Sequence, residues 1–143
     1  MTTAVADPVR AVARVLRDST PVLALVGNDT QRIFHDDFDL TEEARAQARA
    51  GVIVRLIGGG PDASYLPVHA FDIDVLTYGA TAAEARRLAL TVMNTLKHEG
   101  TSVSNRDELL YSISLLSMPI SIRDNRTGWR YFVQTWQALM GDG

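Results

Sequence analysis

The densest group of side chains that could hold a metal is the run His35-Asp36-Asp37-Phe38-Asp39. One imidazole and three carboxylates could bind a hard divalent cation, which prefers oxygen ligands. The run lacks the glycine spacing of a calcium-binding loop. We therefore interpret it as a solvated acidic loop that follows a short strand. The alternative is a small metal-dependent enzyme that uses His35 and the neighbouring aspartates.

Two further patterns resemble sites and have simpler explanations. Asp72 and Asp74 could act as paired carboxylates, but alternation along a strand places them together on its solvent side. The run Gly58-Gly59-Gly60-Pro61 follows a predicted strand, as phosphate-binding loops do. It lacks the Lys-Ser/Thr pair and a helix directly after it, so we interpret it as a mobile loop. The sequence predicts no catalytic, cofactor-binding or metal site.

Arg123, Arg126 and Arg130 cluster around the last predicted turn and could contact nucleic acid. Asp124 lies among them, which favours an ordinary surface hairpin. The net charge of the 143 residues is -3, and a protein that grips the phosphate backbone usually carries a basic face. These observations argue against a nucleic-acid-binding function.

The composition is that of a single globular domain spanning residues 1–143. Apolar residues make up 46% and charged residues 22% of the chain. There is no cysteine, which excludes disulfides and thiolate metal sites. The beginning of the chain, MTTAVADPVR, lacks the features of a signal peptide, and no apolar run approaches the roughly 18 residues of a membrane span. We expect a protein made and kept in a cytoplasm, without a membrane partner.

Two helices are predicted near the start of the chain and one in its middle. Asp7 is predicted to be the N-cap of the first helix, with Pro8 at its first position. Thr20 and Pro21 are predicted to begin a short second helix in the same way, and this helix stops at Gly27. Residues 81–98 form the longest helix, with a Thr81/Glu84 capping box. Apolar side chains recur at helical spacing in two stripes, Val9, Val12, Ala13 and Leu16, and Ala85, Leu88, Ala89, Val92 and Leu96.

Strands are predicted at residues 32–35, 52–57, 70–78, 109–123 and 129–140, with a hairpin loop at 124–128. Residues 41–50 (TEEARAQARA) read as an exposed helical insert. In the strand 109–123, Ile113 and Leu115 are out of phase with Leu116, which predicts a β-bulge or a bend near Leu115 and Leu116. The order α-α-β-(α)-β-β-α-β-β predicts an α+β fold with a mostly antiparallel sheet and helices packed on it.

The final strand is apolar on both faces: Trp129, Tyr131 and Val133 point one way, and Phe132, Trp136 and Met140 the other. The long helix covers one face. Either the first two helices cover the other, or a neighbouring subunit does. Because a large exposed apolar patch is unusual on a monomer, we predict self-association, for which a closed ring is one natural outcome.

Four segments of the chain form a recognisable pattern: the opening helix with TPVLALVG and RIF, the strand FDIDVLT leading into AAEARR, the long strand ending in IRD, and the final TGWRYFVQT. In this pattern the sequence resembles the tail terminator, or tail completion, proteins of long-tailed bacteriophages, prophages and gene-transfer particles. The resemblance spans nearly the whole chain. Related chains often have a shorter, proline-containing segment in place of residues 39–49.

The resemblance implies a non-enzymatic virion protein that forms a ring, typically of six copies. Such a ring caps the tail tube, ends tail polymerisation and offers the surface that joins the head. Implied partners are further copies, the tail tube protein and the head-tail connector protein, with DNA only passing through the lumen. Implied localisation is the head-proximal end of the virion tail, after assembly in the host cytoplasm.

On this basis we assign candidate roles to three groups of residues. Large aromatic side chains dominate interface energetics, so the core and subunit-interface candidates are Trp129, Tyr131, Phe132 and Trp136. The tube or connector contacts are expected in the loops 58–66 and 101–107, with Gly58, Gly59, Gly60, Ser104 and Arg106. The candidates for an acidic channel lining are Asp36, Asp37, Asp72 and Asp74.

Two other functional classes fit the same sequence. One is a different neck component, such as a head-closure or connector-adaptor protein. The other is a dimeric ligand-binding domain in which the glycine-rich loop acts as a lid. No cofactor is predicted for the chain.

Overall fold

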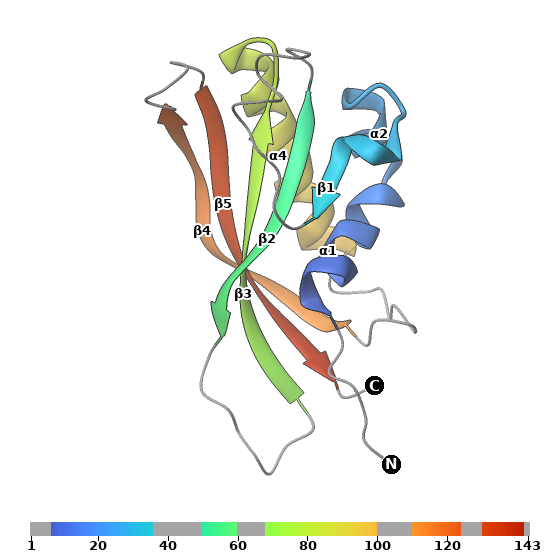
Figure 1. Ribbon diagram of the computed structural model, residues 1–143, viewed down its shortest axis with the longest axis vertical. Coiled ribbons are helices and arrows are strands. Elements are labelled where there is room, and N and C mark those ends of the chain that lie inside the picture. Colours follow the sequence, from blue (N-terminus) through green and yellow to red (C-terminus); the bar gives the residue numbers. More distant parts are fainter. Residues whose placement is uncertain (1–6, 36–49, 60–67, 100–109, 124–129, 142–143) are drawn as a thin grey trace.

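The computed structural model describes residues 7–35, 50–59, 68–99, 110–123 and 130–141 (Figure 1). The elements in chain order are α1 (Pro8–Arg17), α2 (Thr20–Leu25), the 3₁₀ turn η1 (Thr30–Arg32), β1 (Ile33–His35), β2 (Gly51–Gly59), β3 (Val68–Tyr78), α4 (Ala82–Glu99), β4 (Leu110–Arg123) and β5 (Arg130–Gly141). This confirms the α+β class. The predicted helical insert and the hairpin loop lie outside the described residues.

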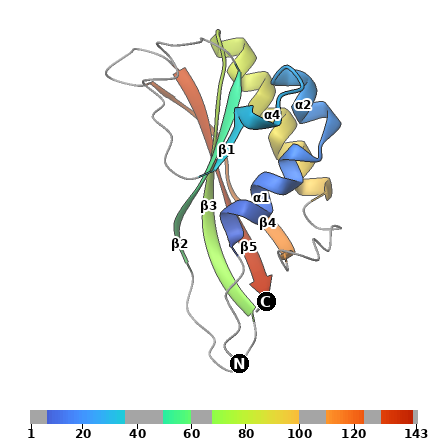
Figure 2. The same ribbon diagram turned by 45° about the vertical axis from the view of Figure 1, so that its right-hand side comes forward.

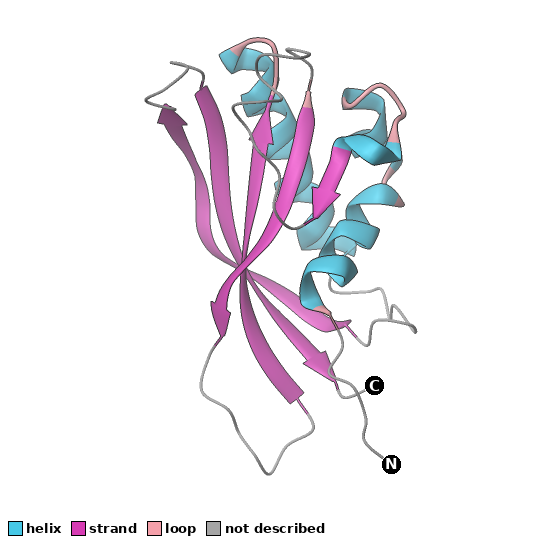
Figure 3. Cartoon of the chain, in the orientation of Figure 1, coloured by secondary structure: helices cyan, strands magenta, loops and turns pink. Residues whose placement is uncertain are grey.

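The strands form one twisted sheet in the order β1-β2-β3-β5-β4 (Figure 3). β1 pairs with β2 in parallel, and every other pairing is antiparallel. The sheet is therefore mostly antiparallel, as predicted. The parallel pairing with β1 covers only Val52 to Val54 of β2.

Local capping explains where the helices begin. Asp7 Oδ1 accepts hydrogen bonds from the main-chain N–H groups of Val9 (3.0 Å) and Arg10 (3.4 Å), as expected for its predicted capping role. For α2 the cap is Ser19 rather than the predicted Thr20, because the Ser19 side chain is the one that accepts from Val22 N–H. Thr81 Oγ1 accepts from Glu84 N–H at 3.1 Å, which confirms the predicted start of α4.

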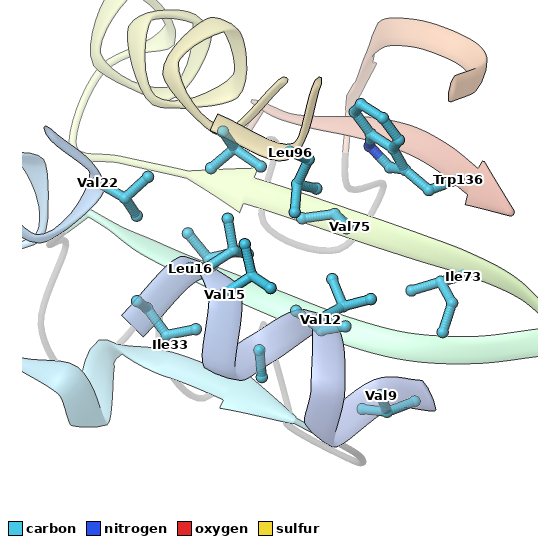
Figure 4. Close-up of a cluster of buried hydrophobic side chains, with 14 of the residues drawn as sticks. Val9, Val12, Val15, Leu16, Val22, Ile33, Ile73, Val75, Leu96 and Trp136 are labelled. Carbon is cyan, nitrogen blue, oxygen red and sulfur yellow. The ribbon is translucent and has the colours of Figure 1, made fainter. Parts of the chain in front are cut away.

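The helices α1, α2 and α4 lie together on one side of the sheet (Figure 2). The predicted helical stripes are buried. All of their members except Ala85 and Ala89 belong to one core cluster with side chains of β1, β2, β3, β4 and β5. Figure 4 shows part of this cluster, in which Leu16, Val75 and Trp136 come from three different elements. The alternative in which the first two helices cover the opposite face of the sheet is therefore wrong.

Buried polar side chains tie the helices to the sheet. Gln134 of β5 is 1% exposed, and its Nε2 donates to the Ala89 carbonyl of α4 at 3.0 Å. Its Oε1 accepts from Trp136 Nε1 at 2.8 Å. Thr77 Oγ1 donates to the Ala85 carbonyl at 3.4 Å. Because a buried polar group without a partner is costly, these bonds help to fix the position of α4 on the sheet.

The strand boundaries differ from prediction at β2, and the bulge in β4 is confirmed. β2 continues through Gly58 and Gly59, which pair with Asp72 and Phe71, so these glycines belong to a strand rather than to the predicted loop. The register shifts between Leu56 and Gly58, which leaves Ile57 as an extra residue.

In β4 the register shifts between Leu115 and Ser117, which makes Leu116 the extra residue at the predicted bulge. A second shift between Ser117 and Ile120 includes Pro119, and a third lies near the start of the strand. Glycine and bulged residues interrupt regular pairing without ending a strand.

The same holds for β2. The glycine-rich composition of residues 58–59 indicated a loop, but both residues belong to the strand.

Candidate assembly surface

We define the open face as the side of the sheet opposite α1, α2 and α4. One straight row of apolar side chains crosses four strands on this face, through the cross-strand pairs Ile53–Leu76, Leu76–Val133 and Val133–Ile120. A second row follows through the pairs Tyr78–Tyr131 and Tyr131–Ile122. Ile53, Leu76 and Tyr78 form a second buried cluster, against which Tyr131 and Val133 pack.

The exposure of the first row rises toward β4. Ile53 and Leu76 are each 3% exposed, Val133 is half-buried, and Ile120 at the other end is 55% exposed. This apolar row is thus buried at β2 and β3, half-buried at β5 and exposed at β4.

Exposed large apolar side chains concentrate on two strands. Among the described residues, one such side chain, Leu90, lies on α4 at 48% exposure. The others are on β2 and β4: Leu56 (49%), Ile57 (51%), Leu116 (53%), Met118 (56%), Ile120 (55%) and Ile122 (38%). Apolar side chains that gather along neighbouring positions of a surface indicate an interaction site more than scattered ones do. The β4 row, Leu116 to Ile122, is the main candidate assembly surface.

Gly51 explains how the large Tyr78 side chain fits at the end of the apolar rows. The two residues are cross-strand partners, and Tyr78 is fully buried. A Cβ on Gly51 would overlap the phenol ring and hydroxyl of Tyr78. The glycine therefore provides the room in which the ring lies.

Beyond the apolar rows, at the levels of Asp74 and Asp72, the open face is polar. We call this part the polar half of the open face. Asp74 pairs across the strands with Arg55 on one side and Thr135 on the other, and Thr135 Oγ1 donates to Asp74 Oδ1 at 2.7 Å. Asp72 lies one row further along, half-buried, and its Oδ1 has no hydrogen-bond partner within the described part of the chain. Both carboxylates face away from the helices, as predicted, and on this face they are candidates for a channel lining.

The four aromatic interface candidates lie in different environments. Trp136 is 1% exposed in the main core, so we propose no subunit contact for it. Tyr131 is half-buried on the open face, and Phe132 is half-buried on the helix side, opposite Ser121. Trp129 lies outside the described residues, so its role stays a prediction.

Several other candidates also fall outside the described residues: Asp36, Asp37, Asp39, Gly60, Ser104, Arg106 and Arg126. The described part of the chain holds no group of three His, Cys, Asp or Glu side chains placed to bind a metal. Arg130, at the start of β5, donates from Nη1 to Ser121 Oγ at 3.4 Å. None of the helices in the described segments has the length and apolar character to cross a lipid bilayer.

The apolar row of β4 was not among the candidate interface residues, which favoured aromatic side chains. Its pattern is visible in LLSMPISIR, where Leu116, Met118, Ile120 and Ile122 alternate with small or polar residues. Alternation predicts a strand with one apolar face. It does not show that the strand lies at the edge of the sheet, where that face is exposed.

The chain was compared with protein-family models, curated proteins and solved structures. No protein-family model and no curated protein matches the chain. Among solved structures, the chain is similar to one from the virion of a native gene transfer agent particle, with a TM-score of 0.57 and 25% sequence identity over 95% of each chain. A protein from Akkermansia muciniphila, solved without its transmembrane region, aligns at a TM-score of 0.36 and 11% identity, covering 99% of this chain and 90% of that one, which is too low to inform fold or function. The likeness to the virion chain extends over nearly the whole length of both proteins.

Proposed function

We propose that the chain is a structural protein of a phage-like virion, and that it forms a ring, typically of six copies, at the head-proximal end of the tail tube. The likeness to a virion chain over 95% of both lengths supports the structural role and carries the proposal. The exposed apolar row Leu116 to Ile122 supports assembly, because virion proteins act through contacts with copies and partners.

In this proposal the ring caps the completed tail tube, stops further polymerisation and presents the joining surface for the head. Its partners are the tail tube protein and the head-tail connector protein. Assembly takes place in the host cytoplasm, and the chain then stays in the virion.

Deleting the gene in the strain that produces the particles tests this role. We expect tubes of uncontrolled length without attached heads in negative-stain electron micrographs, because nothing ends polymerisation. Supplying the intact gene in trans should restore uniform, joined particles. Tails of normal length that fail to join heads would instead identify a head-closure or connector-adaptor protein. Normal, infectious or transfer-competent particles would refute a neck role altogether.

We also propose that the polar half of the open face lines the channel through which DNA passes. Asp72 and Asp74 lie on this face, and like charge keeps DNA from adhering to a lumen wall. Asp74→Lys should slow DNA release from assembled particles, while Asp74→Asn should have a smaller effect. If the lysine variant assembles and releases DNA normally, the channel assignment is wrong.

A further inference from the structure

Among the described strands, the sheet ends with β4 on one side and with β1 and the rest of β2 on the other (Figure 1). Both edges carry exposed apolar side chains, on β4 and on β2. β4 pairs with β5 alone among the described strands. On the other side, β1 covers β2 only from Val52 to Val54, so the stretch 55–59 has no described strand beyond it. Leu56 and Ile57 are about as exposed as Leu116 and Met118 on β4. An edge with no further strand beside it among the described residues can accept another strand.

Leu56 and Ile57 on one edge lie at nearly the same level as Leu116 on the other. The register runs in one line across the sheet through the pairs Leu56–Ile73, Ile73–Trp136 and Trp136–Leu115. Ile57 is the extra residue directly after this line on β2, and Leu116 is the extra residue directly after it on β4. Each edge thus presents a bulged, half-exposed apolar residue next to this row. Because β2 and β4 run in opposite directions, Ile57 lies on the Asp72 side of the row and Leu116 on the Asp74 side.

The strand directions of the two edges are complementary. Three antiparallel pairings separate β2 from β4, so the two strands run in opposite directions. Rotation about an axis along the strands leaves strand directions unchanged. In a ring built around such an axis, β4 of one copy therefore meets β2 of the next in the antiparallel orientation, which is the more stable pairing.

We propose that β4 of one copy pairs edge to edge with the exposed stretch 55–59 of β2 in the next copy, with Leu116 close to Ile57 of that second copy. The proposal rests on the ring proposed above and names the contact that closes it. A single type of contact uses both edges of every copy, and contacts between different surfaces are those that close into rings. A symmetric pair of β4 strands would leave Leu56 and Ile57 exposed.

The size of the contact also favours a ring over an isolated pair. About five residues a side bury less than the roughly 800 Å² per partner of a stable interface. Pro119 removes one main-chain donor from β4, which limits the pairing to a short stretch. In a closed ring each copy makes this contact twice, once through each edge.

Thiol cross-linking tests the contact cleanly, because the natural chain contains no cysteine. The variant with both Ile57→Cys and Leu116→Cys is built into particles and treated with a short bis-maleimide, whose reach tolerates a small difference in register. We expect a ladder of covalent multimers on a denaturing gel, up to the number of copies in the ring. Each single variant should stay monomeric, because the proposed contact brings together one residue of each kind.

The control pairs Leu116→Cys with Leu90→Cys, because Leu90 is equally exposed but lies on α4. This control should give no ladder. Dimers formed by Leu116→Cys alone would show a symmetric β4 contact and overturn the proposal. A double variant that is present in particles but stays monomeric would also overturn the proposed contact. The proposed function would still stand in that case.

The same variants are also treated as purified, concentrated chains, after thermal unfolding has shown that they fold like the parent. A ladder in solution from a chain that is absent from particles would uphold the edge contact and refute the proposed function. Absence of the ladder in both preparations would refute the contact.

Discussion

Gln134 on β5 reaches across to α4, where its Nε2 donates a hydrogen bond to the Ala89 carbonyl at 3.0 Å. The same amide accepts from Trp136 Nε1 through its Oε1. The buried Gln134 side chain thus provides the acceptor for the Trp136 indole N–H and links β5 to α4. Nothing in the alternating pattern of the strand distinguishes this glutamine from a surface residue.

We predict that Gln134→Ala lowers the free energy of unfolding by about 1–3 kcal/mol, because Trp136 Nε1 loses its acceptor inside the core. Urea denaturation followed by circular dichroism measures the change. Gln137→Ala is the matched control, since Gln137 lies three residues further along the same strand and is only half-buried. Equal effects of the two substitutions would contradict the importance of the bond to α4.

Leu88 and Leu90 on α4 form a pair that separates core packing from surface effects. Leu88 is 1% exposed and Leu90 is 48% exposed. Leu88→Ala should cost about 2–5 kcal/mol through lost burial and the cavity left behind, whereas Leu90→Ala should change stability by no more than about 0.5 kcal/mol. Thermal unfolding of the two variants decides the matter, and a large loss for Leu90→Ala would mean that α4 is rotated on the sheet.

Gly51→Ala should destabilise the chain by about 1–3 kcal/mol, because its methyl group overlaps the Tyr78 ring in a packed interior. Gly58→Ala in the same strand is the control, since a methyl group there would meet no other atom within 4 Å. Combining Gly51→Ala with Tyr78→Ala should cost less than the sum of the single changes, because the overlap disappears. Additive losses in chemical denaturation would show that the two residues do not interact.

Ile120→Ser tests whether the β4 row serves assembly rather than folding. Ile120 is 55% exposed, so its replacement should change the free energy of unfolding by less than about 0.5 kcal/mol. Incorporation into purified particles should fall strongly, as measured by immunoblotting. Leu90→Ser, with similar exposure on α4, should be incorporated normally. If both variants enter particles like the parent chain, the row is not an assembly surface.

The sequence predicted the parts of the fold that follow from periodicity and capping. The stripes of α1 and α4, the cap at Asp7 and the bulge at Leu116 are local features, so the residues that cause them are adjacent in the chain. The extension of β2 through Gly58 and Gly59 was missed because it depends on pairing with β3. Strand pairing brings together residues that are distant in sequence, and glycine composition carries no information about it.

The candidate surface was predicted only in outline. A surplus of apolar side chains on the last two strands was visible, but which of them are exposed depends on the position of each strand in the sheet. β5 is an inner strand and β4 an outer one, so Trp136 is enclosed while Met118 is exposed. The residue pattern of a strand does not show which strands lie beside it in the sheet, so it could not settle which of the two is the outer strand.

Pro119 and the two register shifts around it affect how readily the β4 edge can start aggregation. Amyloid fibrils grow by stacking flat, regular strands without proline, and a long apolar edge is their usual starting point. The register shifts and Pro119 interrupt the regular spacing of main-chain hydrogen-bonding groups along β4, so another strand cannot stack on it regularly. An edge interrupted in this way is therefore a poor starting point for fibrous aggregation.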